Sequence, residues 1–185
     1  AGLFVGLIIS IATLTHHSAK PHMVVLGELS NGTLQSASYF PDAKPLPNTL
    51  AVRMDAALCF ANADKFKAFI LHEVDKTHSA AAAGEPILYV LADMSGVNDV
   101  DTTGLQVLGE IRCELEKLGV ALILGDLKYT VIRKFVKASK TGGQMSMPQS
   151  HLYLDIQEAV DVVKRQRTGS DAREMYEEYA RRNKF

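Results

Sequence analysis

The sequence has almost no net charge, few cysteines and no glycine-rich phosphate-binding loop. Its 20 Lys and Arg residues nearly balance its 21 Asp and Glu residues, which leaves a formal net charge of −1. Neither a basic patch with interleaved aromatic residues nor a zinc-ligand spacing is present, so we expect no nucleic-acid partner and no metal. No motif for a nucleotide is found either, because a P-loop and its lysine are missing, and we expect no cofactor.

The chain contains only 2 cysteines. Cys59 lies at the end of an apolar, strand-like segment, and Cys113 lies in a helical pattern. Isolated thiols in such positions are typical of small, buried apolar side chains in a reducing compartment. The sequence alone leaves a disulfide between them open.

Residues that could carry catalysis are not arranged as a catalytic site. His72 and His78 are six positions apart, so they do not share a helix face as ligands at i and i+4 would. Asp93, Asp99 and Asp101 crowd one loop, where carboxylates could bind magnesium or transfer protons. Asp also builds turns, and we favour that interpretation here. We therefore predict that the chain is not an enzyme.

The length of 185 residues is enough for one well-buried core with appendages. The chain begins with alanine and its first fourteen residues carry no charge, so we expect a piece of a longer protein. At about 1.5 Å per residue, the apolar run 2–14 reaches about 20 Å, short of a bilayer core of roughly 30 Å. We interpret residues 1–18 as the end of a transmembrane segment; the alternative is a helix packed on the domain. We expect residues 166–185 to form a charged helix or tail.

Strand and helix patterns alternate along residues 19–165. We predict strands at 22–29 and 50–58, a short strand at 38–40, and one exposed face on the 50–58 strand because charged and apolar residues alternate there. Asn62 can begin a helix whose apolar stripe contains Phe66, Phe69, Ile70 and Val74.

Two unbroken apolar runs, at 87–92 and 120–124, are typical of parallel strands buried on both faces. The helix between them has an apolar stripe and ends at Gly119, which predicts a right-handed crossover. The stripe contains Leu105, Leu108, Ile111, Leu115 and Leu118. A further helix around 131–136, a short strand at 152–154 and a helix from Asp155 to Val163 complete the pattern.

The loop before the long helix is the most informative stretch. Thr103 and Gln106 fit a capping box, which predicts a helix starting there with Thr102 just outside its first turn. Free N–H groups and the positive end of the helix dipole would favour an anion or a phosphoryl group at Thr102. The alternative is that both threonines only cap the helix.

Three segments resemble one family. The loop D-x-S-G-V-N-x-V-D-T-T-G-L, residues 93–105, resembles the signature loop of STAS domains, which occur in SulP anion transporters and in anti-sigma-factor antagonists. Residues 58–63, L-C-F-A-N-A, resemble a segment that SulP-type STAS domains carry before their first helix. Residues 19–27 resemble the junction between the last membrane helix of a SulP transporter and its cytosolic domain. The resemblance covers about residues 1–165.

The resemblance implies an α/β fold with a STAS-like mixed sheet of about four to six strands and helices mainly on one face. Thr102 stands where antagonist proteins present a phosphorylatable serine, so it is the candidate regulatory phosphosite. The other residues of the motif loop, which we define as residues 93–104, are candidate contact residues. They are Asp93, Ser95, Gly96, Asn98, Asp101, Thr103 and Gly104.

The implied function is that of a non-catalytic, cytosolic regulatory and interaction domain of a sulfate-type anion transporter, with a multi-pass membrane parent. Candidate partners are the membrane domain of that transporter, a regulatory protein and a second copy of the chain. The alternative is a soluble partner-switch protein like the anti-sigma-factor antagonists, but the apolar run 2–14 counts against it. A third hypothesis is a small-ligand site or an enzyme at the strand ends. Its only support is that open α/β sheets often bind ligands at the carboxyl ends of their strands.

Overall fold

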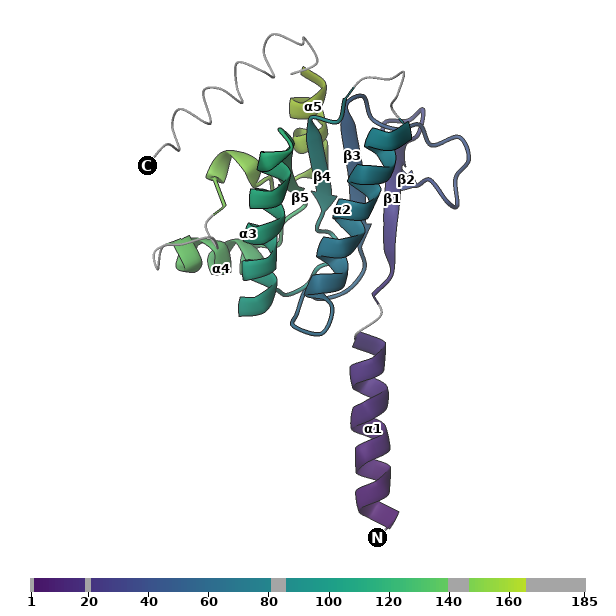
Figure 1. Ribbon diagram of the computed structural model, residues 1–185, viewed down its shortest axis with the longest axis vertical. Helices are drawn as coiled ribbons and strands as arrows, with labels where there is room; N and C mark the ends of the chain where they lie inside the picture. Colours follow the sequence, from purple (N-terminus) through teal and green to yellow (C-terminus); the bar gives the residue numbers. More distant parts are fainter. Residues whose placement is uncertain (1, 19–20, 81–85, 140–146, 166–185) are drawn as a thin grey trace.

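The computed structural model describes residues 2–18, 21–80, 86–139 and 147–165. The predicted tail at 166–185 lies outside the described residues, as do Gly142 and Gly143, which the sequence predicts to close the helix around 131–136. The described residues form one mixed sheet with helices on both of its faces, and a separate helix at the N-terminus (Figure 1).

The sheet has five strands in the order β2-β1-β3-β4-β5. The strand β1 runs antiparallel to both of its neighbours, whereas β3, β4 and β5 are parallel. This arrangement confirms the predicted mixed α/β sheet. The strands are β1 (Met23–Glu28), β2 (Leu34–Ser36), β3 (Thr49–Met54), β4 (Tyr89–Asp93) and β5 (Ala121–Gly125).

Most of the helices lie on one face of the sheet, as predicted. Buried residues of α2 (Ala63–Ala80), α3 (Thr102–Lys117) and α4 (Tyr129–Ser139) belong to the larger hydrophobic cluster. The opposite face carries α5 (Ile156–Arg165), which packs with β4, β5 and the chain around Leu46 in a second cluster. A 3-10 turn, η1, precedes α5 at Gln149–His151.

The helix α1 (Gly2–Ser18) extends away from the domain (Figure 1). The large apolar side chains described in its first half are exposed, for example Leu3 and Phe4, which are 86% and 73% exposed. The alternative prediction, a helix packed on the domain, is therefore wrong for this structure. Among the described residues no helix combines the length and the apolar character needed to cross a membrane.

Several local predictions need correction. Residues 38–40 form a turn, and the short strand is β2 instead, because its backbone pairs with Leu26 and Gly27 of β1. The strand β3 stops at Met54 and both of its faces are covered, since Ala51 joins the second cluster on the α5 side. Leu152 makes only an isolated bridge to Leu124 rather than a strand.

Other local predictions are confirmed. The helix α2 starts directly after Asn62, and α3 ends before Gly119, which adopts a φ of 74°. Asp155 caps α5 because its Oδ1 accepts a hydrogen bond from the backbone N–H of Gln157. Cys59 and Cys113 are free thiols, and both are half-buried rather than fully buried.

Candidate functional site

The motif loop connects the end of β4 to the start of α3. Because β3, β4 and β5 are parallel, their carboxyl ends meet at the same edge of the sheet, and β1, running the other way, starts there. Figure 1 shows that α1 leaves the domain from this end, which we call the loop end. The loop end therefore contains the motif loop, the N-termini of α2 and α3, and the connection to α1.

The first half of the loop is fixed by short-range contacts. Asp93 is buried, and its Oδ1 accepts a hydrogen bond of 2.9 Å from the backbone N–H of Ser95. Gly96 lies directly against the end of β3, where an added Cβ would be 2.6 Å from the backbone oxygen of Met54. Only glycine fits there without a shift of the backbone, so the loop and the end of β3 form one packed unit.

The second half of the loop pairs with the segment that follows β3. Leu58 and Val100 form an isolated parallel bridge. The backbone N–H of Leu58 donates to the carbonyl of Asp99 at 2.9 Å, and the N–H of Asp101 donates to the carbonyl of Leu58 at 3.1 Å. A Cβ on Gly104 would be 2.7 Å from that same Leu58 carbonyl oxygen, so α3 begins in close contact with this segment.

Asp101 is the N-cap of α3, and the predicted capping box of Thr103 and Gln106 is wrong. One carboxylate oxygen of Asp101 accepts from the backbone N–H of Gly104 at 2.7 Å, and the other accepts from the N–H of Phe60 at 2.9 Å. Asp is among the best N-cap residues, and here its second oxygen also has a partner from a distant turn. Gln106 instead donates to Glu110 within the helix.

Thr102 is the first residue of α3, and both Thr102 and Thr103 are exposed. The hydroxyl of Thr102 therefore lies in solvent at the electropositive end of the helix, two positions further into the helix than predicted, because the N-cap is Asp101 and not Thr103. This position is open to a modifying enzyme or a partner. It is neither in the interior nor in the middle of the helix.

The charged residues of the loop are held by α4 and by the residue that precedes it. Lys134 contacts the carboxylate of Asp99 at 2.5 Å and donates to the carbonyl of Val100 at 2.8 Å. The hydrogen bond from Lys134 lowers the pKa of Asp99 below its ordinary value. Lys128, directly before α4, donates to the side-chain oxygen of Asn98. The aspartates of this loop thus bind backbone N–H groups or a lysine, and the described residues contain no group of three or more His, Cys, Asp or Glu that could hold a metal ion.

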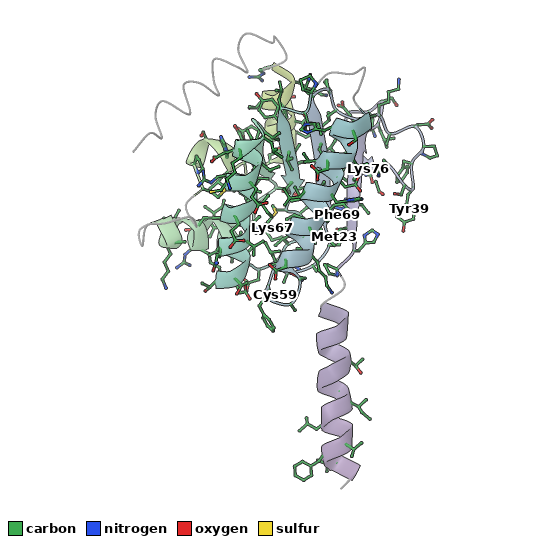
Figure 2. All side chains as sticks on the ribbon, in the orientation of Figure 1. Met23, Tyr39, Cys59, Lys67, Phe69 and Lys76 are labelled. Atoms are coloured by element: carbon green, nitrogen blue, oxygen red, sulfur yellow. The ribbon has the colours of Figure 1, made fainter. Side chains whose placement is uncertain are left out.

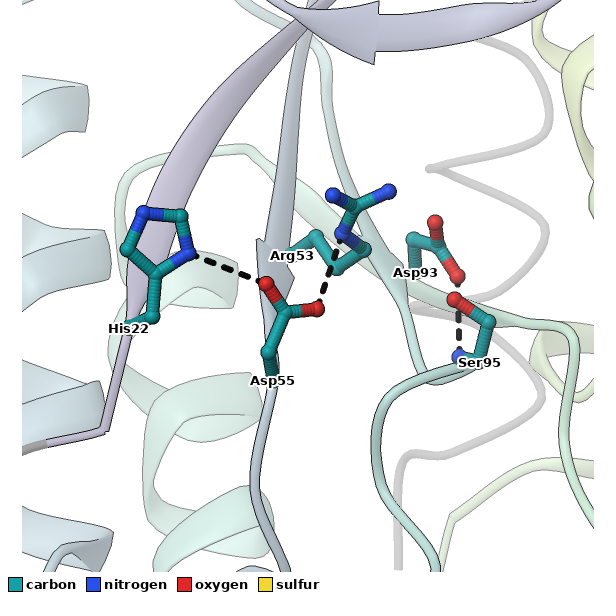
Figure 3. Close-up of polar contacts among 5 residues, drawn as sticks. All are labelled: His22, Arg53, Asp55, Asp93 and Ser95. Atoms are coloured by element: carbon teal, nitrogen blue, oxygen red, sulfur yellow. Dashed lines mark hydrogen bonds and ion pairs between the residues drawn. The ribbon is translucent and has the colours of Figure 1, made fainter.

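An ion-pair chain beside the loop was missed by sequence reasoning. The carboxylate of Asp55 contacts Nδ1 of His22 at 3.0 Å and Nε of Arg53 at 3.0 Å (Figure 3). In the same view Asp93 and Ser95 of the motif loop lie next to Arg53. The alternation of charged and apolar residues in the predicted 50–58 strand placed Asp55 on the surface, but nothing in the sequence indicated that His22, just before β1, would be its partner.

The turn between β3 and α2, residues 57–62, was also not recognised as part of the site. The side chain of Asn62 is buried, accepts from the N–H of Cys59 at 3.0 Å and donates to the carbonyl of Ala57 at 2.9 Å. Together with the bond from Asp101 to Phe60, these contacts hold the turn rigidly beside α3. The side chain of Phe60 is nevertheless 72% exposed.

The site as a whole combines an exposed hydroxyl, a helix N-terminus and a well-fixed loop. The family model described as STAS domain matches residues 40–159, which is most of the chain. The chain therefore belongs to the STAS domain family.

Sulfate transporters are among its relatives in the curated proteins. Sulfate transporters 2.1 and 3.1 of Arabidopsis thaliana are 33% and 28% identical, and each alignment covers 86% of this chain and 24% of the relative. A probable sulfate transporter of Mycobacterium tuberculosis is 29% identical over 89% of this chain and 28% of its own length. The chain thus spans about a quarter of the length of the curated relatives it matches.

Solved structures support the same fold. The murine anion transporter Slc26a9 in its inward-facing state aligns with a TM-score of 0.70 and 22% identity, covering 88% of this chain and 25% of that one. A sulfate transporter family protein from Wolinella succinogenes aligns with a TM-score of 0.50 and 21% identity, covering 68% of this chain and 95% of that one. At these identities the likeness concerns the fold alone.

Proposed function

We propose that this chain is the cytosolic regulatory domain of a sulfate-type anion transporter, and that it acts by contact rather than by catalysis. The observation that carries the proposal is the position of Thr102, exposed at the first turn of α3 on a loop that is fixed on both sides. The sulfate transporters among its relatives support the assignment to a transporter.

The site offers a surface and lacks the parts of a reaction centre. A nucleophile needs a base within hydrogen-bonding distance, and the carboxylates around Thr102 are engaged otherwise. Asp101 receives two backbone N–H groups, and Asp99 is paired with Lys134. These contacts stabilise the loop and leave the hydroxyl of Thr102 as the chemically variable group at its tip.

Phosphorylation of Thr102 is the regulatory event that we propose. A phosphate adds about −1.5 to −2 charge at pH 7. The N-terminus of α3 stabilises it by up to about 1 kcal/mol, while Asp101 repels it. Since Lys134 already neutralises Asp99, the two effects nearly cancel, and the phosphate changes the surface of the loop end without unfolding it.

A soluble partner-switch protein is the less favoured alternative. Such a protein has no use for α1, which carries exposed apolar side chains such as Leu3 and Phe4. The relatives of a soluble partner-switch protein would also be expected to be free-standing proteins. The curated relatives described above are instead transporters, and the part that aligns with this chain is about a quarter of their length.

The proposal predicts that sulfate uptake by the parent transporter depends on Thr102. We expect Thr102→Ala to change the uptake rate or its regulation by about fivefold, the effect of a coupling free energy near 1 kcal/mol. Thr103→Ala is the matched control, because Thr103 is the next residue, is equally exposed and lies in the same helical turn. Equal uptake by wild type and Thr102→Ala, at equal amounts in the membrane, would refute the proposed role.

A further inference from the structure

The helix α4 exposes apolar side chains that a surface helix would normally bury. Its inner face contains Val131, Phe135 and Ala138, which are buried in the larger cluster. Its outer face contains Tyr129 and Val136, which are 71% and 42% exposed. The outer face of a surface helix is ordinarily polar, because water solvates it. The helix α4 is therefore apolar on two sides, and the described residues cover only one of them.

The exposed apolar residues of α4 form one stripe. Tyr129, Ile132 and Val136 are spaced i, i+3 and i+7, so they follow one another along the same helix face. Ile132 is partly buried against the larger cluster and joins the stripe to the core. Arg133 and Lys137 are exposed and flank the stripe. The outer face of α4 thus combines apolar groups, an aromatic ring with a hydroxyl, and cations.

The charge of α4 and of the residues before it is mainly positive. Residues 126–139 contain four cations, of which Lys134 pairs with a carboxylate of the motif loop, and one acidic residue, Asp126. Lys128 donates to the side chain of Asn98, and because an amide carries no charge, this contact leaves the positive charge of Lys128 in place. A basic amphipathic helix is typical of attachment to an anionic membrane surface.

The helix α4 lies at the loop end, from which α1 leaves the domain. It begins shortly after β5 ends, and Lys134 donates to the carbonyl of Val100 in the motif loop at 2.8 Å. Figure 1 shows the axis of α4 running across the axis of α1. A helix bound to a membrane surface lies in the plane of the membrane, whereas a helix that crosses the membrane stands close to its normal. The orientation of α4 therefore fits a membrane into which α1 leads.

We infer that the outer face of α4 binds the anionic lipid surface of the cytosolic leaflet. This inference rests on the proposed function, which places the domain beside a membrane. Tyr129 and Val136 enter the boundary between headgroups and acyl chains, and the flanking cations contact the lipid phosphates and carboxylates. Since Lys134 joins α4 to the motif loop, the lipid contact holds the loop that carries Thr102 at the membrane surface.

Tryptophan fluorescence of the chain in lipid vesicles tests this inference. The chain contains no tryptophan, so Tyr129→Trp places a single reporter on the outer face of α4. Vesicles of phosphatidylserine and phosphatidylcholine with brominated acyl chains should quench this reporter, and brominated phosphatidylcholine alone should quench it at least about fivefold less. The matched control is Tyr39→Trp, because Tyr39 is also 71% exposed and lies on the other side of the domain from α4 (Figure 2). Both variants contain α1, so the comparison between them isolates α4.

A pair of charge variants in the Tyr129→Trp chain tests the contribution of the cations. Arg133→Gln together with Lys137→Gln should reduce binding to the phosphatidylserine vesicles by at least about fivefold, because two cations leave the lipid-facing surface. The matched control is Lys76→Gln together with Lys117→Gln, which removes two exposed cations near the C-terminal ends of α2 and α3, away from the loop end. The control pair should change the binding by less than about twofold.

Four outcomes would overturn the inference. They are equal quenching of the two reporters, including none; quenching at position 129 that does not depend on phosphatidylserine; equal losses from the two charge pairs; and a change of fluorescence at position 129 when the chain is concentrated without vesicles, which would assign the face to a second copy. Every variant must first show the thermal unfolding of the wild type, which exposed positions permit.

The result is separable from the proposed function. Sulfate uptake that depends on Thr102 with no quenching at position 129 rejects only the lipid contact. Specific quenching at position 129 with uptake that is insensitive to Thr102 rejects only the regulation.

Discussion

At the scale of single residues, Asp101 organises the site. Its two carboxylate oxygens accept from two backbone N–H groups that are far apart in sequence, those of Phe60 and Gly104. One side chain thereby caps α3 and fixes the turn before α2. The exposed neighbours Thr102 and Thr103 contribute nothing comparable to the described contacts of the loop. The supporting residue Asp101 is therefore adjacent to Thr102, the residue that we propose to carry the signal.

This division of roles predicts a graded effect of substitutions at Asp101. Asp101→Ala removes both bonds and should lower the free energy of unfolding by about 2 kcal/mol. Asp101→Asn keeps one accepting oxygen and should lose about half as much, because its amide nitrogen cannot accept the second N–H. Thr103→Ala, the control, should change stability by less than about 0.5 kcal/mol. Urea unfolding of the chain measures all three, and equal stability of the Ala and Asn variants would contradict the two-bond arrangement.

At the scale of elements, α2 and α3 are joined across the larger cluster by a charged network. Nζ of Lys67 contacts Glu110 at 3.1 Å and Glu114 at 2.7 Å, and Figure 2 shows Lys67 between the two helices. The hydrogen bonds to Glu114 and then Glu110 raise the pKa of Lys67, and the bond from Lys67 lowers the pKa of Glu110. The network sets the position of α3 and so of its N-terminus.

Loss of this network should be measurable as stability. Lys67→Met keeps the apolar stem and removes the charge, and it should lower the free energy of unfolding by about 1 kcal/mol. Lys76→Met is the matched control, because Lys76 pairs only with Glu73 of its own helix and should cost about 0.5 kcal/mol or less. If both variants unfold at the same urea concentration, the ion pairs of Lys67 between α2 and α3 do not stabilise the domain more than the pair within α2.

The turn η1 carries a group that makes stability depend on pH. Burial lowers the pKa of His151 below its ordinary 6.5, the nearby Arg112 lowers it further, and the backbone hydrogen bond at Leu122 and the charge of Glu116 oppose these effects. Well above pH 6.5 this histidine is neutral in both the folded and the unfolded chain. Below it the unfolded chain binds a proton first, so the free energy of unfolding falls as the pH falls towards the folded pKa.

Thermal unfolding of wild type and His151→Gln at about pH 7.5 and about pH 5.5 checks this sign. The wild type should lose more stability on acidification than the variant, which has no imidazole to protonate. Parallel losses in the two proteins would show that other groups cause the pH dependence.

The elements that sequence reasoning placed well are those whose packing is decided locally. The runs that became β4 and β5 are apolar throughout because both faces are covered, and the stripe of α3 has helical spacing. Features decided by distant residues were missed. Asp101 rather than Thr103 caps α3, with Phe60 supplying a second N–H to the same carboxylate. The second face of β3 is covered because Ala51 packs in the cluster that also contains Leu46 and residues of α5. The position of β2 follows from its pairing with β1.

At the scale of the whole molecule, the topology gathers the variable surface at one end. Three parallel strands finish there, and β1 starts there after the connection from α1. The motif loop was identifiable from the sequence, but its neighbours Phe60, His22 and Asp55 were not, since they reach the loop only through the sheet. The domain thus presents the hydroxyl of Thr102, the proposed regulatory site, on the side from which α1 leaves.

The central claim is that charge at the N-terminus of α3 controls the transporter. Sulfate uptake by a pair of variants with side chains of equal size tests this claim most directly. Thr102→Asp adds a negative charge at the exposed first turn, and Thr102→Asn adds the same volume without the charge. We expect uptake by the two variants to differ by about fivefold at equal expression, with Thr102→Asn close to the unphosphorylated wild type. Equal uptake by Thr102→Asp and Thr102→Asn would contradict control of transport by charge at this position.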